Sequence, residues 1–311
     1  MTSPSSLFTH LPILSKSKPP TTLPPFLYGT AWKKDHTTPL VQTALQNTFT
    51  AIDTACQPRH YREDLVAAGI RQHLSSPNNK NKLTRSDIYI QTKYTSIGGQ
   101  DPNNIPYNPK ASLTEQVQQS VATSLRNFTV NNEQPYLDAL ILHSPMPTMG
   151  QTLEVWSALE QYVPDRIRHL GISNTDLQTL MALYDTARIK PSIVQNRFYA
   201  DTKYDVAIRK FCGERGMVYQ CFWTLSANPG LLRSEVVMDV ARNLQIEPAN
   251  ALYCLVLGLG NTVVLNGTTS VEHMRGDWEG VRRVREFAEG DREGWEDVMR
   301  RFRGVIGERV D

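Results

Sequence analysis

Three ionisable side chains of different kinds stand at or near the ends of short runs rich in apolar and β-branched residues. They are Asp53 of FTAIDTA, Lys93 of IYIQTKY and His143 of LDALILHS. A carboxylate, an ammonium and an imidazole in one place could hold and transfer protons. Taken singly, each also has a structural explanation: a capping aspartate, an exposed strand lysine or a histidine hydrogen-bonded at a corner. The chemical interpretation therefore depends on the elements that would bring the three together.

The whole chain alternates such runs with amphipathic segments of helical length. We predict eight strands, at residues 26–32, 49–55, 88–94, 137–144, 167–174, 191–198, 218–225 and 262–269. Eight strand–helix repeats favour an α/β fold of the (β/α)8 TIM barrel type. In such a barrel the carboxyl ends of the strands share one rim, so Asp53, Lys93 and His143 would be neighbours there. The same rim would receive further polar groups: Ser173-Asn174, Gln195-Asn196 and residues 266–269.

An open, doubly wound sheet is the competing architecture. It would normally carry a G-x-G-x-x-G turn between a strand and the following helix, and the sequence contains none. Gly258-Leu259-Gly260 precedes a predicted strand, which is the wrong order for binding phosphate and typical of a helix C-terminus.

Length and composition fit one large globular domain. The chain has 311 residues, 40% of them hydrophobic and 21% charged, with a formal net charge of +2. These values exclude a wholly disordered chain, and the weak charge does not favour nucleic acid or an anionic membrane as partners. Residues 1–24, rich in Ser, Thr and Pro, predict a flexible N-terminal arm. Residues 25–311 would form a single barrel domain with a C-terminal helical or lid segment.

The remaining sequence features concern location and redox state. The apolar run 251–260 is too short to cross a bilayer of about 30 Å and predicts a buried helix. The N-terminus does not resemble a secretory signal, so we expect a cytoplasmic protein. The four cysteines have no metal-ligand spacing and are expected to be reduced thiols, and no metal site is predicted; they are Cys56, Cys212, Cys221 and Cys254.

Five runs, in this order and on successive predicted strands, resemble the aldo-keto reductases. They are IDTACQPRHYREDLV, IYIQTKY, YLDALILHSP, IRHLGISN and KPSIVQNRFY. The resemblance extends over most of the chain, from about residue 26 to about residue 277. It implies a reductase in which a tyrosine gives a proton to a carbonyl, supported by an aspartate, a lysine and a histidine. By motif these residues are Tyr61, Asp53, Lys93 and His143.

The chemistry of these side chains agrees with those roles. A phenol has a reference pKa near 10, and we expect the Lys93 ammonium to lower the pKa of Tyr61. Asp53 would be the counter-ion of Lys93, and His143 could donate a hydrogen bond to the substrate oxygen. Tyr61 lies eight positions after Asp53, where the family usually has five, which implies a three-residue insertion and a longer loop at 56–60. His60 is therefore the reserve candidate for the acid.

The resemblance also implies a nicotinamide dinucleotide bound in extended form. The implied contacts are Thr30, the carboxamide partners Ser173, Asn174 and Gln195, the ring-stacking Phe222 or Trp223, and Thr268, His273 and Asp277 at the adenosine end. Ser173-Asn174 could instead be only a helix cap.

The adenosine end departs from the family's basic signature. Gly267-Thr268 followed by His273 replaces Lys-Ser followed by Arg. A 2′-phosphate is best held by Arg or Lys, so the preference between the two dinucleotides is open. Arg275 could substitute for the missing cation, and we favour NADP(H) over NAD(H).

The sequence therefore predicts an NAD(P)H-dependent reductase of aldehydes or ketones. Ser144 stands where many relatives have a tryptophan, and Trp32 with the Phe222-Trp223 pair would line a pocket for an apolar or cyclic carbonyl. Two alternatives remain open. One is a catalytically weak or inert nicotinamide-binding regulatory paralogue on the same barrel; the other is a lyase or isomerase that uses Lys93 as a Schiff base.

Overall fold

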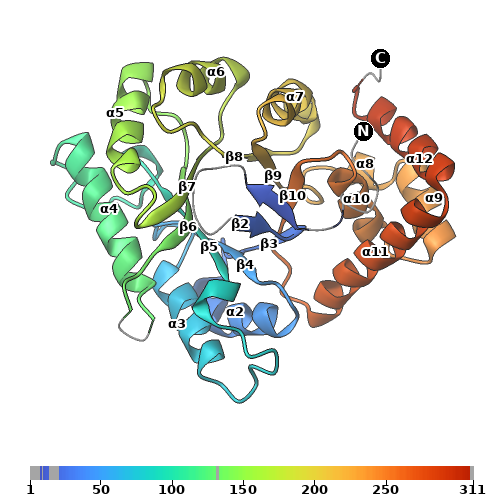
Figure 1. Cartoon of the computed structure of the whole chain (residues 1–311), viewed down its shortest axis with the longest axis horizontal. Helices are drawn as coiled ribbons and strands as arrows, with labels where there is room; N and C mark the ends of the chain where they lie inside the picture. The colour runs from blue at the N-terminus through green and yellow to red at the C-terminus, as the bar shows by residue number, and fades with distance from the viewer. Residues whose placement is uncertain (1–7, 9, 14–20, 131–132, 309–311) are drawn as a thin grey trace. The chain divides into compact units, whose positions relative to one another are not determined.

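The computed structural model describes residues 8, 10–13, 21–130 and 133–308. Eight strands form a closed barrel in the order β10-β3-β4-β5-β6-β7-β8-β9 (Figure 1). Strands β10 and β9, and each consecutive pair from β3 to β8, run parallel. The prediction of a (β/α)8 TIM barrel is confirmed. The barrel strands are β3 (Phe26–Gly29), β4 (Ala51–Asp53), β5 (Tyr89–Tyr94), β6 (Leu137–Leu142), β7 (Ile167–Ser173), β8 (Ile193–Arg197), β9 (Val218–Phe222) and β10 (Thr262–Asn266).

Contacts group the chain into two units. Unit 1 comprises Met1–Ile13, Thr22–Phe26 and Asn196–Asp311, and unit 2 comprises Leu14–Thr21 and Leu27–Gln195. The single domain over 25–311 stays a prediction.

Unit 2 carries the parallel strands β4, β5, β6 and β7 and the first helices. In β5 and β6 every residue is buried, as expected for parallel strands covered on both faces. The strand register sets Asp53 opposite Gln91, and Lys93 opposite Ile141. The helices of this unit are α2 (Thr37–Gln46), α3 (Glu63–Leu74), α4 (Leu113–Asn127), α5 (Met149–Glu160) and α6 (Leu177–Thr186), with 3-10 turns η1 (Lys34–His36), η2 (Arg85–Asp87) and η3 (Ile97–Gly99).

Local sequence explains why these helices begin where they do. Ser112 and Glu115 form a capping box at the start of α4, and Asp176 accepts from the Thr179 N–H at the start of α6. Such caps satisfy backbone donors that the first helical turn leaves unpaired. Inside β7, residue 171 is a glycine because its neighbours leave no room for a side chain. A Cβ on Gly171 would lie 2.5 Å from Ile141 Cδ1 and 2.7 Å from the Ile193 carbonyl oxygen.

Unit 1 contains the paired strands β9 and β10 and the remaining helices. These are α7 (Val206–Glu214), α8 (Pro229–Leu232), α9 (Glu235–Leu244), α10 (Pro248–Leu257), α11 (Val271–Gly290) and α12 (Arg292–Val305), with the 3-10 segment η4 (Ala200–Asp205). Helix α10 is the buried helix predicted at 251–260, and Gly258 is its C-cap. The four cysteines are buried and free, as expected. No helix in the described part of the chain combines the length and the apolar character needed to cross a membrane.

The N-terminal arm predicted at 1–24 is corrected in part. Strands β1 (Leu11–Ile13) and β2 (Thr21–Leu23) form a two-stranded sheet, and Phe8 packs edge-on against Trp295 of α12, with ring centroids 5.7 Å apart. The physical reason is that apolar side chains within this Ser- and Pro-rich stretch, such as Phe8, pack against other parts of unit 1. Residues 1–7, 9 and 14–20 lie outside the described residues.

The arginine-rich C-terminal segment forms helices with many charged pairs on their surface. Arg282 pairs with Glu279 and Glu286 at 2.6 Å, and Arg301 pairs with Asp239 of α9 at 2.6 Å. Exposed pairs of this kind contribute little stability, and they fit a solvated helix face. The role of this segment as a lid stays a prediction.

Candidate active site

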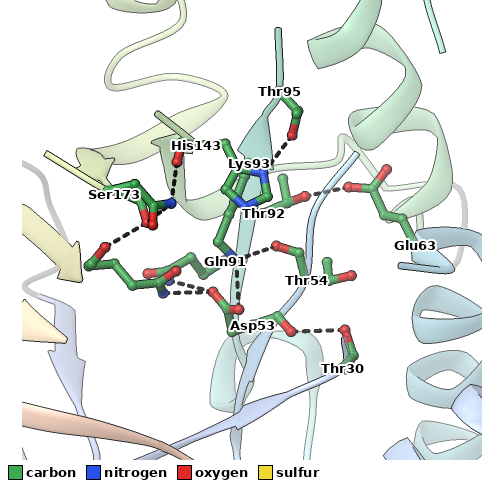
Figure 2. A network of polar contacts seen from close by, with 12 residues as sticks. Thr30, Asp53, Thr54, Glu63, Gln91, Thr92, Lys93, Thr95, His143 and Ser173 are labelled. Atoms are coloured by element: carbon green, nitrogen blue, oxygen red, sulfur yellow. Dashed lines mark hydrogen bonds and ion pairs between the residues drawn. The ribbon is translucent and has the colours of Figure 1, made fainter. Parts of the chain in front are cut away.

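The four residues Asp53, Tyr61, Lys93 and His143, called the acid–base cluster below, all lie in unit 2. Asp53 is the last residue of β4, and Lys93 is the penultimate residue of β5. His143 follows β6 directly, and its N–H donates to the Tyr94 carbonyl at 2.9 Å. The carboxyl ends of three neighbouring parallel strands therefore deliver three of the four predicted side chains (Figure 2).

Asp53 and Lys93 form a buried ion pair. Lys93 Nζ donates to Asp53 Oδ2 at 2.6 Å and to the Thr54 carbonyl at 2.8 Å, and both side chains are at most 2% exposed. Burial lowers the pKa of Lys93, against the raising effects of Asp53 and Glu63. An ammonium has three N–H groups, so one remains for a further acceptor.

The other oxygen of Asp53 is held by two amides. Gln91 Nε2 donates to Asp53 Oδ1 at 2.7 Å and Gln195 Nε2 donates to it at 3.0 Å. The Thr30 hydroxyl donates to the Asp53 main-chain carbonyl at 2.9 Å. The carboxylate therefore has partners for both oxygens, which a buried charge requires.

Tyr61 lies beside this ion pair despite the longer connection. Lys93 Nζ is 5.3 Å from the centroid of the Tyr61 ring, and the Tyr61 and His143 rings meet edge to face at 6.1 Å and 70°. The sequence prediction that these residues come together agrees with these contacts. The predicted pKa change is wrong, because burial, followed by the charge of Asp53, raises the pKa of Tyr61. The phenol is therefore protonated at neutral pH.

His143 is held as a neutral imidazole. Burial, with smaller effects of Lys93 and His60, lowers its pKa to about 3. Its Nδ1 is 2.6 Å from the Thr95 hydroxyl. When that hydroxyl donates to Nδ1, the proton of the neutral ring is on Nε2, which can then donate to another group.

The inserted segment between Asp53 and Tyr61 is fixed by hydrogen bonds to β5 and the loop after it. The Cys56 N–H donates to the Lys93 carbonyl at 3.1 Å. Gln57 Nε2 donates to the Gly99 carbonyl at 2.7 Å, and Gln100 Nε2 donates to the Cys56 carbonyl at 3.0 Å. These bonds explain how the insertion still presents Tyr61 to Lys93.

His60, the reserve candidate, is engaged by a neighbouring aromatic ring. Its ring stacks on Trp32 with centroids 3.7 Å apart and planes tilted by 37°, and the Trp32 N–H donates to the His60 carbonyl at 2.8 Å. Burial and the adjacent Arg59 lower the pKa of His60. Trp32 itself is 64% exposed, so its indole offers an accessible apolar face.

The predicted carboxamide partners lie at the end of β7 and within β8. Ser173 Oγ donates to the Gln195 carbonyl at 2.6 Å, and Asn174 Nδ2 donates to the His143 carbonyl at 2.8 Å. Asn174 is exposed and has φ +52°, a left-handed conformation that asparagine tolerates. Ser173, Gln195 and Thr30 are buried with partners inside the protein. Their role as cofactor contacts stays a prediction.

In unit 1, the predicted stacking residues form an aromatic group at the end of β9. The Phe222 and Trp223 rings meet at 6.0 Å and 86°, and the Arg197 guanidinium lies 4.6 Å from the Trp223 ring centroid. Trp223 is 51% exposed and has φ +59°. A left-handed backbone conformation is unusual for a bulky residue such as Trp223. Its exposed indole suits a binding surface.

The loop after β10 is organised around Asp277. Asn250 Nδ2 donates to Asp277 Oδ1 at 2.7 Å and Asn266 Nδ2 donates to Oδ2 at 2.5 Å. Asn266 Oδ1 in turn accepts from the Thr268 N–H at 2.9 Å. His273 is exposed in the first turn of α11, 3.4 Å from the Thr268 hydroxyl. Asp277 as a direct cofactor contact stays a prediction, and both its oxygens already accept hydrogen bonds.

Sequence reasoning missed several supporting residues. Gln91 and Thr95 lie two positions before and after Lys93, and residues two apart on a strand point to the same face. The two-residue spacing from Lys93 was the sequence feature that could have identified Gln91 and Thr95. Glu63, which accepts from the Thr92 hydroxyl at 2.5 Å, gives no comparable pattern. Across the described residues, no group of three or more His, Cys, Asp or Glu side chains could hold a metal ion.

Comparisons with known proteins point to one family. The model of the aldo/keto reductase family matches residues 27–251. The chain is similar to an uncharacterized oxidoreductase, YtbE, of Bacillus subtilis (28% identity, covering 65% of this chain and 63% of the relative). It is also similar to a glyoxal reductase of the same organism (25% identity, covering 65% and 62%). The matches therefore span less than two thirds of these relatives' lengths.

Among solved structures, the chain is similar to a Bombyx mori aldo-keto reductase determined in complex with NADP. The TM-score is 0.67 at 16% identity, and the match covers 88% of this chain and 92% of the other. A likeness at this identity supports the barrel fold.

Proposed function

The chain belongs to the aldo/keto reductase family, and on that premise we propose that it is an NAD(P)H-dependent reductase of small carbonyl compounds with Tyr61 as proton donor. The observation that carries this proposal is the contact of the Tyr61 ring with both the buried Lys93 ammonium and the neutral His143 ring. A cytoplasmic location is part of the same proposal.

The nicotinamide, when bound, supplies the hydride that reduces the carbonyl carbon. The Tyr61 phenol, protonated because its pKa is raised, gives its proton to the carbonyl oxygen as negative charge develops there. The Lys93 ammonium, 5.3 Å from the centroid of the Tyr61 ring, stabilises the phenolate that this transfer leaves. Asp53 keeps Lys93 in place through the 2.6 Å ion pair.

His143 has the second role at the substrate oxygen. Its neutral ring, oriented by Thr95, can donate from Nε2 to that oxygen without adding a full charge to the pocket. A fixed donor of this kind lowers the energy of the developing oxyanion and selects the orientation in which the carbonyl faces Tyr61.

The residues present suit a dinucleotide. The exposed Asn174 amide, held by the His143 carbonyl, can pair with a carboxamide, with Ser173 and Gln195 as further partners, and the exposed Trp223 ring or Phe222 can stack on a nicotinamide. Thr268 and the first turn of α11 can hold phosphate, and Thr30, His273 and Asp277 complete the proposed set. We favour NADP(H) over NAD(H).

The surroundings of Tyr61 favour an apolar or cyclic carbonyl substrate. The exposed Trp32 indole, stacked on His60, offers a flat apolar face. Ser144, whose hydroxyl donates to the His143 carbonyl, takes little space after the catalytic histidine. Both features suit a ring or a hydrocarbon better than a small polyol.

A catalytically weak nicotinamide-binding paralogue is the second candidate, favoured by the absence of Lys or Arg at Gly267 and His273. A Schiff-base enzyme fits less well, because Lys93 Nζ donates to Asp53 and Thr54.

The test is a fluorescence titration with NADPH and NADH separately, followed by turnover of a panel of aliphatic, aromatic and cyclic aldehydes and ketones. We expect binding of at least one dinucleotide and its oxidation with the apolar members. Binding without turnover would favour the inert paralogue, and failure to bind either dinucleotide would favour the Schiff-base enzyme.

A further inference from the structure

A second buried carboxylate lies close behind the acid–base cluster. Glu63, the first residue of α3, is 6% exposed. Its Oε1 accepts from the hydroxyls of Thr92 at 2.5 Å and Ser124 at 2.8 Å, and its Oε2 accepts from Asn127 Nδ2 at 2.9 Å. These three donors are all neutral groups.

The partners of Glu63 connect the turn that carries Tyr61 to the strand that carries Lys93. Glu63 follows Tyr61 by two residues, and Thr92 directly precedes Lys93 on β5. Because successive strand residues point to opposite faces, Thr92 faces Glu63 while Lys93 faces Asp53, as Figure 2 shows. Ser124 and Asn127 extend the connection to α4.

Keeping Glu63 ionised in this buried position costs free energy. Burial raises the pKa of Glu63, and its hydrogen bonds only oppose that effect. A glutamine in place of Glu63 could make similar hydrogen bonds. The hydroxyls of Thr92 and Ser124 can rotate, and the Asn127 amide can flip to exchange its oxygen and nitrogen. The negative charge has one further consequence that an amide lacks: it favours the protonated form of Lys93.

We propose that Glu63 is a positioning residue for the reaction: its carboxylate fixes the turn bearing Tyr61 against β5, and its charge helps to keep Lys93 an ammonium. This inference rests on the proposed function, since it assigns Glu63 a part in the step that Tyr61 and Lys93 perform.

The charge around these groups sets the expected pH dependence. Lys93 pairs with Asp53 on β4 and lies near the Tyr61 ring and the neutral His143 after β6. The charge of Glu63, which is hydrogen-bonded to the neighbouring Thr92, also acts on Lys93. Glu63 itself lies near the Cys56 thiol. Removing the Glu63 charge leaves Asp53 as the only anion in this set. Lys93 then loses its proton at a lower pH, and the alkaline limb of the kcat profile moves to lower pH.

The experiment compares Glu63→Gln and Glu63→Asp with Asp64→Asn, an exposed neighbour on the same helix turn that pairs with Arg62. For Glu63→Gln we expect kcat to fall by about tenfold to a hundredfold, with the alkaline limb shifted to lower pH and the dinucleotide Kd changed less than about threefold. Glu63→Asp should keep the wild-type pH limb while losing part of kcat. Asp64→Asn should match the wild type in both.

Two further results decide the inference. If Glu63→Gln lowers the melting temperature but leaves kcat and its pH profile unchanged, Glu63 is only structural and the inference is overturned. If Glu63→Gln does not fold, Thr92→Val, which removes one donor without changing size, must show a smaller fall in kcat; wild-type kcat in that variant would also overturn it. Wild-type inactivity, or an active Tyr61→Phe, would instead overturn the proposed function.

Discussion

Two buried aspartates, Asp53 in unit 2 and Asp277 in unit 1, differ in whether a cation accompanies them. Asp53 is paired with Lys93 at 2.6 Å and also accepts from two glutamine amides. Among the described residues, Asp277 accepts from the amides of Asn250 and Asn266. Burial raises the pKa of Asp277 to about 6, although the amides and His273 oppose that rise.

The presence or absence of a neighbouring cation gives a buried carboxylate two different roles. Next to an ammonium it forms an ion pair, which can hold a reactive lysine beside a phenol. Held by amides alone, it becomes a group that titrates near neutral pH while it organises a loop. The first arrangement should govern the chemical step, and the second should govern loop stability and cofactor selection.

The largest effect is expected for Tyr61→Phe. The variant keeps the ring contacts with Lys93 and His143 but lacks the acidic hydroxyl, so reduction of a good aldehyde should fall by about 10²–10⁴-fold. Dinucleotide affinity should stay within a few-fold, measured by fluorescence titration alongside kcat. Retained turnover would move the acid elsewhere, with His60 first.

Lys93→Met should cause a loss of the same order, because the phenolate formed by proton transfer would lose its cation and Asp53 would be left as an unpaired buried charge. Arg168→Met is the matched control. It removes a cation from another buried aspartate, Asp138, which Arg168 contacts at 2.8 Å and Arg85 contacts at 3.1 Å. The control should lower the unfolding midpoint in urea and leave kcat near wild type. An unchanged pH–rate profile in Lys93→Met would contradict the role of Lys93.

A smaller, pH-dependent effect is expected for Asp277→Asn. Because the pKa of Asp277 is raised from 3.8 to about 6, its contribution to stability is present below about pH 4 and is lost as pH rises through 6. The variant has no such loss. Its stability relative to wild type should therefore increase between pH 4 and pH 7, by on the order of 2 kcal/mol, in urea unfolding at each pH. A difference that stays constant with pH would show that Asp277 does not titrate in this range.

The smallest effect concerns the choice of dinucleotide. With Gly267 and His273 in place of two cations, NADPH should be preferred over NADH by no more than about tenfold, or about 1.4 kcal/mol.

Restoring the charge sharpens this prediction. Gly267→Lys combined with His273→Arg should raise NADPH affinity and leave NADH affinity nearly unchanged. If the wild type already prefers NADPH a thousandfold, another cation holds the phosphate, with Arg275 the first to test.

The barrel and three members of the acid–base cluster could be predicted from sequence because strand periodicity and strand ends are local features. Asp53, Lys93 and His143 each stand at the end of a recognisable strand. The position of Tyr61 could be predicted only by resemblance, since it lies beyond an insertion whose path depends on the Gln57 and Gln100 side-chain contacts.

Other properties depend on three-dimensional surroundings that no spacing shows. The raised pKa of Tyr61 follows from its burial and from Asp53, whereas sequence reasoning considered only the charge of Lys93. The partners of Glu63 come from β5 and α4, about 30 and 60 residues along the chain. The two strands within the predicted N-terminal arm were also missed, because short apolar stretches among Ser and Pro carry little periodic signal.

The most direct measurement of the central claim is transfer of the label from a dinucleotide deuterated at both C4 positions, with an apolar aldehyde as substrate and mass spectrometry of the product. The account predicts an alcohol carrying one deuterium on the former carbonyl carbon, formed by the wild type and lost in Tyr61→Phe. A product without deuterium, or equal labelled product from both proteins, would contradict it.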